Sequence, residues 1–225
     1  MSHPTRQLAI DLPYREALGR ADFLVSDCNR AAMGWIEGWP DWPARRLVLY
    51  GPEGSGKSHL GRLWCAASGA RHVAGGSLAQ HEPLLGNGAV PPGIAVDDAE
   101  AASEIALLHL YNSCAEAGIG LLVVGRQAPA SWPVALSDLA SRLRAMPAVG
   151  IEPPDDALLG AVLVKHFADR QLRVMPSVIG YLVPRMERSF AMAAALAGRL
   201  DELALAAGRP IGLPLARRAL AELGA

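Results

Sequence analysis

The sequence predicts an α/β fold, in which a parallel sheet with helices on both faces is followed by a small all-α domain. As far as residue 152, short apolar runs typical of buried strands alternate with longer helical segments, which is the pattern of a parallel sheet with helical crossovers. From Pro153 onward no strand pattern appears, and helical segments follow one another. We therefore expect an extended segment at 1–13, an α/β domain at 14–152 and a helical lid at 153–225.

The individual elements follow from apolar periodicity and from turn and cap residues. The runs with the length and composition of strands are 46–50, 71–74, 94–96, 121–124 and 148–151. Helices of the first domain are expected at 28–37, 58–67, 101–117 and 133–144. Helices of the lid are expected at 155–169, 176–185, 187–206 and 213–223. Asp27 and Asp155 stand where an N-cap would begin a helix.

A glycine-rich stretch directly follows the first strand and satisfies every fixed position of the Walker A template G-x-x-x-x-G-K-[ST]. It consists of Gly51, Pro52, Glu53, Gly54, Ser55, Gly56, Lys57 and Ser58. Such a loop turns consecutive backbone N–H groups toward phosphate oxygens, and the following helix adds its positive N-terminal end. We expect Lys57 to reach the β- and γ-phosphates and the Ser58 hydroxyl to hold Mg²⁺. A chance glycine turn is the alternative, and the strand–loop–helix order argues against it.

A second acidic motif ends the third strand. The run Gly93–Val96 is apolar and delivers Asp97 and Asp98 to its carboxyl end, as in a Walker B motif. We assign Asp97 to the metal and Asp98 to polarising the attacking water. The simpler alternative is that one of these carboxylates caps the next helix. With a full Walker A motif upstream, the functional interpretation is favoured, and the fold class becomes that of a P-loop NTPase.

The composition of the chain indicates which partners and which cellular location to expect. The 225-residue chain has a formal net charge of −1, which gives no global electrostatic reason for direct nucleic-acid binding. Residues 151–225 carry nine Lys and Arg against eight Asp and Glu, so the lid has no basic face either. The three cysteines form no C-x-x-C pair, and no apolar run resembles a signal core or a membrane span. These features predict a cytoplasmic protein with reduced thiols and no membrane association.

Three segments resemble the DnaA family of AAA+ proteins, and more closely its Hda branch, which lacks the initiator's DNA-binding domain. They are 107–125, then 136–143 with 151–154, and 186–190. With the Walker motifs in register, the resemblance covers nearly the whole chain. It implies an AAA+ nucleotide-binding domain with a lid, and ADP or ATP with Mg²⁺ as cofactors.

The resemblance also assigns roles to single residues. It makes Arg142 an arginine finger, whereas an exposed helix face shared with Arg144 is the alternative. Arg188 is the candidate for the sensor 2 arginine, although it is also compatible with a solvated helix position. His59, beside the phosphate loop, is a candidate nucleotide contact or a helix-surface or core residue. Sensor 1 is expected to be polar and uncharged or acidic, but Arg126 stands there, which weakens the case for efficient hydrolysis by this chain alone.

The N-terminal residues resemble the clamp-binding peptide of the Hda branch, in which a glutamine is followed by spaced aliphatic side chains that dock in apolar pockets. The residues expected to contact the clamp are Gln7, Leu8, Ile10 and Leu12. A free tail or an added strand is the alternative for this segment.

The resemblance implies a regulator of replication initiation that docks on the DNA polymerase sliding clamp and stimulates ATP hydrolysis by the DnaA initiator in trans. Its association with DNA would then be indirect, through the clamp, and a homo-oligomer is compatible with the sequence. Two alternatives stay open. One is an autonomous AAA+ ATPase acting on DNA as a helicase-loader-like factor, and the other is a nucleotide-stabilised interaction protein without catalytic stimulation.

Overall fold

The computed structural model describes residues 23–80 and 90–224. Its sheet has five strands, all parallel, in the spatial order β2-β3-β4-β1-β5. The strands are β1 (Arg46–Tyr50), β2 (Arg71–Ala74), β3 (Gly93–Asp97), β4 (Gly120–Gly125) and β5 (Ala148–Gly150). This arrangement confirms the predicted α/β fold class, and each strand lies within one or two residues of its predicted range.

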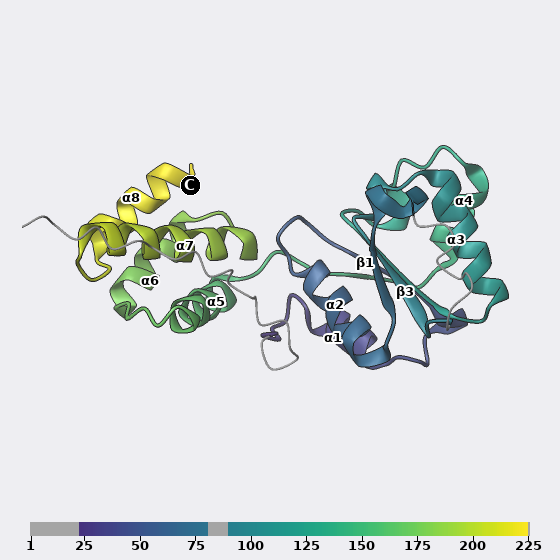
Figure 1. The fold of residues 1–225 in the computed structure, drawn as a ribbon, viewed down its shortest axis with the longest axis horizontal. Helices are drawn as coiled ribbons and strands as arrows, with labels where there is room; N and C mark the ends of the chain where they lie inside the picture. The colour runs from purple at the N-terminus through teal and green to yellow at the C-terminus, as the bar shows by residue number, and fades with distance from the viewer. Residues whose placement is uncertain (1–22, 81–89, 225) are drawn as a thin grey trace, which may run out of the picture.

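Helices cover both faces of the sheet (Figure 1). On one face lie α1 (Arg30–Glu37) and α2 (Lys57–Ser68), and on the other lie α3 (Glu104–Glu116) and α4 (Ser137–Ala145). Successive strand residues point to opposite faces, so Leu47 and Leu49 pack with α1 and α2, whereas Val48 packs with α3 and α4. Burial on both sides explains why the central strands are continuous apolar runs rather than alternating ones.

Three tryptophans form a cluster between α1, α2 and the sheet. The rings of Trp39 and Trp64 meet edge to face with centroids 5.2 Å apart, and Trp42 stacks on Trp64 at 5.1 Å. A Cβ atom on Gly120 would lie 2.3 Å from the Trp39 ring, and one on Gly93 would lie 2.6 Å from Trp64. These glycines are therefore required by the close approach of the rings, and the tryptophans serve the core.

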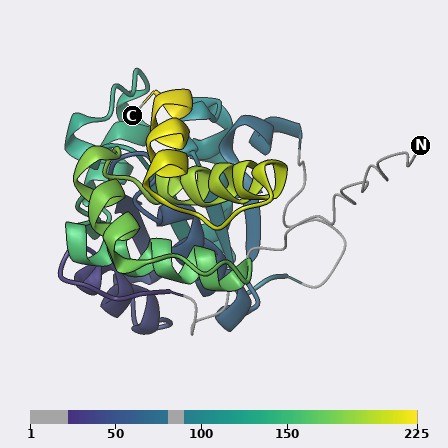
Figure 2. The same ribbon diagram turned by 90° about the vertical axis from the view of Figure 1, so that its left-hand side faces the viewer.

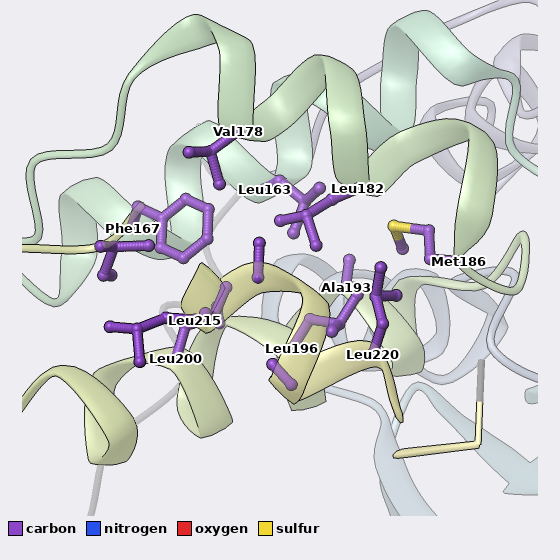
Figure 3. Close-up of a cluster of buried hydrophobic side chains, with 14 of the residues drawn as sticks. Leu163, Phe167, Val178, Leu182, Met186, Ala193, Leu196, Leu200, Leu215 and Leu220 are labelled. Atoms are coloured by element: carbon purple, nitrogen blue, oxygen red, sulfur yellow. The ribbon is translucent and has the colours of Figure 1, made fainter. Parts of the chain in front are cut away.

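The lid consists of α5 (Asp156–Asp169), α6 (Pro176–Leu182), α7 (Phe190–Ala207) and α8 (Leu213–Leu223). These helices enclose their own apolar core, which includes Leu163, Phe167, Leu182, Leu196 and Leu220 (Figure 3). Seen from the lid side, its helices lie in front of the sheet domain (Figure 2). The four lid helices thus pack around an apolar core, and the domain boundaries at 13/14 and 152/153 stay predictions.

The residues at the helix starts show which of the predicted N-terminal caps are correct. Asp155 caps α5 as predicted, because its carboxylate accepts a hydrogen bond of 2.7 Å from the Leu158 N–H. The cap predicted at Asp27 is wrong: α1 begins after Asn29, and the Asp27 carboxylate instead pairs with Arg30. In the lid, α7 begins three residues later than expected because the Ser189 hydroxyl caps it at the Met192 N–H.

Short 3-10 turns connect several of these elements, and the one at Ala99–Ala101 delays the start of α3 to Glu104. The others are Pro43–Arg45, Gly75–Gln80, Pro129–Ser131 and Val183–Arg185. Within the described ranges, no helix has the length and apolar character needed to cross a bilayer.

Replacing Gly120 with alanine should lower the free energy of unfolding by about 1–3 kcal/mol, because the added methyl group overpacks the Trp39 ring. Gly198→Ala is the matched control, since a Cβ on Gly198 meets nothing within 4 Å in the middle of α7. That control should be neutral or stabilising by up to about 1 kcal/mol. Urea unfolding followed by far-UV circular dichroism measures both, and equal effects of the two substitutions would contradict the packing argument.

Candidate phosphate-binding site

The carboxyl ends of β1, β3 and β4 meet at one edge of the sheet and surround a hollow of about 250 Å³. Each strand contributes the residues that follow it: the glycine-rich loop after β1, the two aspartates that end β3, and the turn after β4. The lining residues are Glu53, Gly54, Lys57, Ser58, Asp97, Asp98, Val124, Gly125 and Arg126. The structure therefore brings the two sequence motifs into one site, at the sheet edge where open parallel sheets bind ligands.

The glycine-rich loop has the backbone shape that its sequence predicts. Gly54 has φ = 70° and Gly56 has φ = 93°, values in the left-handed region that favours glycine. Ser55 is fully buried, and its Oγ has no hydrogen-bond partner among the described residues. The Lys57 Nζ donates a hydrogen bond of 2.6 Å to the Pro52 carbonyl oxygen, so the ammonium group lies against the loop itself. A phosphate group fits this arrangement as an alternative acceptor for the same ammonium donor.

At both Lys57 and Asp97, burial and the neighbouring polar groups shift the pKa in opposite directions. Burial lowers the pKa of Lys57, and the nearby carboxylates of Asp97 and Glu100 counteract it only in part. For Asp97, burial acts to raise the pKa, but hydrogen bonding to His72 and Ser58 outweighs burial, and its pKa lies below the ordinary value. Asp97 is therefore ionised near neutral pH and is suited to a cation.

The metal-ligand pair predicted from the sequence lies together. The Ser58 hydroxyl donates to Asp97 Oδ1 at 3.2 Å, and His72 Nε2 lies 3.4 Å from Asp97 Oδ2. In the part of the chain that the structure describes, no group of three or more His, Cys, Asp or Glu side chains could hold a metal by itself. Ser58 and Asp97 fit a Mg²⁺ ion that takes most of its oxygen ligands from phosphate and water.

Asp98 lies at the same edge but is engaged in an ion pair. Its backbone is left-handed, with φ = 51°, and its Oδ1 lies 3.7 Å from Arg126 Nε. Arg126 Nη1 also lies 3.2 Å from Glu53 Oε2 in the phosphate loop. The sequence singled out Arg126 as a departure from a family pattern, but did not reveal that it links the two motifs.

The lid contacts the phosphate loop directly. The Phe190 N–H donates a hydrogen bond of 2.8 Å to the Gly54 carbonyl oxygen. A Cβ on Gly54 would lie 2.6 Å from the Ser189 Cβ, and one on Gly56 would lie 3.2 Å from the Phe190 ring. The loop glycines are thus needed for the approach of α7 as well as for the turn. A second cavity of about 400 Å³ lies between the loop and α7, next to the first.

Of the predicted nucleotide contacts, Gly51, Pro52, Ser55 and Gly56 of the loop do not line this hollow, and neither do the two candidates outside the loop, His59 and Arg188. Arg188 Nη2 pairs with Asp156 Oδ1 at 2.9 Å, between the start of α7 and the start of α5. The His59 ring packs edge to face on Phe23, with ring centroids 5.3 Å apart. Their roles toward a nucleotide stay predictions, and for Arg188 such a role requires the guanidinium to leave Asp156.

The predicted arginine finger lies at the other end of the sheet. Arg142, in the last turn of α4, forms a two-point ion pair with Asp138, with Nε–Oδ1 at 3.0 Å and Nη2–Oδ2 at 3.3 Å. Its guanidinium carbon also lies 5.3 Å from the centroid of the Tyr111 ring, as does that of Arg46, the first residue of β1. Arg142 is therefore near the amino-terminal end of β1, whereas the phosphate loop follows its carboxyl end.

Two supporting residues had no sequence signal. The Glu100 carboxylate accepts hydrogen bonds from the backbone N–H groups of Arg126 and Gln127 and fixes the turn after β4. Tyr111 orients Arg142 through its ring face, a cation–π contact between α3 and α4. Each acts across elements that are distant in sequence, which is why residue patterns did not reveal it. The clamp-binding residues predicted at 7–12 lie outside the described residues.

The parallel sheet with helices on both faces and the Walker A loop after β1 give the chain a P-loop fold of the AAA+ type. No known protein-family model matches the sequence. Domain III of the replication initiation protein DnaA from Thermotoga maritima superposes with a TM-score of 0.81 at 16% identity, over 94% of this chain and 98% of that one. AMPPCP-bound DnaA from Aquifex aeolicus gives a TM-score of 0.66 at 17% identity, over 80% of this chain and 63% of that one.

A motor protein has a similar fold. The Holliday junction branch migration motor RuvB from Thermotoga maritima gives a TM-score of 0.62 at 14% identity, over 79% of this chain and 61% of that one. This chain therefore spans less than two thirds of the RuvB chain and of the Aquifex aeolicus DnaA chain. At these identities the likeness establishes a DnaA-like AAA+ fold and leaves activity and partners to be argued from the residues.

Proposed function

We propose that this chain binds ADP or ATP with Mg²⁺ in the hollow at the carboxyl ends of β1 and β3. The loop from Gly51 to Gly56 would surround the phosphates with backbone N–H groups, and Lys57 would exchange its bond to Pro52 for phosphate oxygens. Ser58 and Asp97 would hold the metal, which supplies charge neutralisation to the phosphates when bound. The structural likeness to AMPPCP-bound DnaA supports an adenine nucleotide as the ligand.

We further propose that the chain is a regulator of replication initiation that acts on ATP bound to a partner. The observation that carries this proposal is the position of Arg142 on the Tyr111 ring, which also contacts the first residue of β1, Arg46. Arg142 lies near the amino-terminal end of β1, and five extended residues separate the two ends by roughly 16 Å. A guanidinium there is too far to serve its own nucleotide, whereas its position on the surface allows it to reach the γ-phosphate of a neighbouring subunit.

The proposed partner is the DnaA initiator, whose domain III shares this fold. A neighbouring AAA+ subunit of the same shape would present its phosphate edge to the Arg142 surface, and the guanidinium would stabilise charge as hydrolysis proceeds. Asp138 and Tyr111 would hold Arg142 in position beforehand, which reduces the entropy lost on docking. The proposed DNA polymerase sliding clamp would concentrate the chain near DNA through residues 7–12.

An autonomous ATPase acting as a helicase-loader-like factor is the alternative, and the RuvB likeness is compatible with it in fold alone. The Asp98 carboxylate, proposed to polarise water, is paired with Arg126. A carboxylate oxygen that faces a guanidinium is less available to orient the attacking water, so this geometry favours slow turnover by the chain itself.

Lys57→Ala should strongly weaken binding of Mg–ADP and Mg–ATP, because it removes the ammonium group proposed to bind the phosphates. Isothermal titration calorimetry should show at least a tenfold loss of affinity, with the unfolding transition of the free protein nearly unchanged. Lys165→Ala, in α5 of the lid, is the matched control and should bind as the wild type does. Retained binding in Lys57→Ala would overturn the assignment of the site.

Arg142→Ala should prolong the lifetime of DnaA-bound ATP in a reaction that contains DNA-loaded clamp, DnaA and this chain. Arginine fingers contribute ~10³–10⁵ in rate where they have been measured, so at least a tenfold loss of stimulation is expected. The neighbouring exposed Arg144→Ala is the control. Equal losses from both substitutions would favour a general basic face over a finger.

Asp138→Asn tests the positioning of Arg142 separately, because it weakens the two-point ion pair and leaves the guanidinium in place. The same hydrolysis assay should show retained stimulation, since the Tyr111 ring still contacts Arg142. Complete loss of stimulation would mean that the ion pair itself forms the contact surface.

Removal of residues 1–12 should eliminate stimulation that depends on the clamp, while nucleotide binding stays at the wild-type level. Gln7→Ala is the point variant that makes the same test without shortening the chain. The checks are co-sedimentation with the clamp and the DnaA-bound ATP assay. Unchanged clamp binding in both variants would reject this segment as the contact.

A further inference from the structure

A histidine on the edge strand β2 reaches the carboxylate of Asp97. β2 pairs in parallel with β3, the strand that ends in Asp97. Val73 and Val96 pack on the face of the sheet that α3 and α4 cover. Successive strand residues point to opposite faces, so the side chains of His72 and Asp97 lie on the other face, toward α2. The sheet register thus brings His72 to the carboxylate that the sequence assigned to the metal.

The two carboxylate oxygens of Asp97 have different partners. Oδ1 accepts hydrogen bonds from the Ser58 hydroxyl at 3.2 Å and from the Asp98 backbone N–H at 3.1 Å. In the described part of the chain, the one polar partner of Oδ2 is His72 Nε2, at 3.4 Å. His72 is not among the residues that line the hollow, so it approaches the carboxylate from outside the pocket.

The contact between His72 and Asp97 is largely shielded from water. The side chains are 29% and 16% exposed, and the Nε2 atom itself is buried. Nε2 has no well-aligned hydrogen bond to any other described residue. A buried polar atom is costly when it lacks a partner, so Asp97 is the group toward which this nitrogen is directed. A separation of 3.4 Å is longer than a strong hydrogen bond and leaves room for the contact to tighten.

A cation held by Ser58 and Asp97 would make this contact more important. It would compete for Oδ1 with the two donors that hold that oxygen in the structure. The orientation of the carboxylate would then depend on what holds Oδ2. Carboxylates that bind metals are generally fixed by such outer hydrogen bonds, and the loss of one typically lowers metal affinity by about 10- to 100-fold.

We propose that His72 is a positioning residue for the metal of the nucleotide site. Its neutral imidazole donates the Nε2–H to Asp97 Oδ2 and thereby keeps the other carboxylate oxygen directed toward Ser58 and the cation. This inference rests on the proposed site for an adenine nucleotide with Mg²⁺. It assigns to His72 a part of the affinity for the metal-bound nucleotide, and no part of the affinity for the nucleotide alone.

The test compares two substitutions that keep much of the side-chain volume. His72→Gln retains an N–H donor, whereas His72→Leu removes it. Calorimetry on the full chain measures ADP affinity at increasing Mg²⁺ concentration and again in excess EDTA. His72→Leu should raise the Mg²⁺ concentration that half-maximally tightens ADP binding by about 10- to 100-fold, and His72→Gln should stay within about threefold of the wild type. In EDTA both variants should bind ADP as the wild type does.

Two controls separate positioning from a general effect on the fold. His109→Ala removes an exposed histidine from α3, on the other face of the sheet, and should match the wild type at every Mg²⁺ concentration. In an Asp97→Asn background, His72→Leu should cause no further change in the response to Mg²⁺, because His72 acts through that carboxylate. A further loss in that background would contradict the inference.

A purely structural histidine predicts a different outcome. Both His72 variants would then lower the thermal unfolding midpoint of the free protein and leave the response to Mg²⁺ unchanged, which would overturn the inference. Equal loss of that response in His72→Gln and His72→Leu would also overturn it. Failure of the wild-type chain to bind ADP would instead reject the proposed nucleotide site, and the inference with it, so the two failures are distinguishable.

Discussion

The position of β1 between β4 and β5 is the constraint on which the rest of the structure depends. Leu47, Val48 and Leu49 are fully buried, so the strand can neither shift nor rotate without exposing both halves of the sheet core. Its carboxyl end therefore holds the glycine-rich loop beside Asp97. Its amino-terminal end holds Arg46 under the Tyr111 ring that also contacts Arg142. One rigid strand fixes two charged regions at opposite ends of the domain.

The sequence predicted this framework because its signals are local. Apolar runs identified all five strands, and a motif with fixed spacing identified Lys57 and Ser58. Strand order was not predicted, since it depends on which apolar faces meet across long connections. The pairing of Arg126 with Glu53 and Asp98 was also missed, because three separate loops converge there only after the sheet forms. The same holds for the start of α1, where Asn29 takes the N-cap position and its side chain bonds to the Ser26 N–H and the Leu24 carbonyl oxygen rather than to the helix.

The lid and the sheet domain have separate cores, so their coupling depends on few contacts. At the phosphate loop, the contact is the hydrogen bond from Phe190 to Gly54 and the packing of α7 on Gly54 and Gly56. A ligand that reorders the loop moves the carbonyl oxygen to which α7 is bonded. The angle of the lid is then linked to what the loop holds, and binding energy at the loop can shift the population of lid positions.

The charged residues beside the phosphate loop affect how fast a bound nucleotide can be hydrolysed. While Arg126 pairs with Asp98, that carboxylate faces the guanidinium rather than the attacking water, and a neutral side chain at 126 would leave it free. The arrangement thus favours a long-lived nucleotide that holds the platform of Arg142, rather than rapid turnover at the chain's own site.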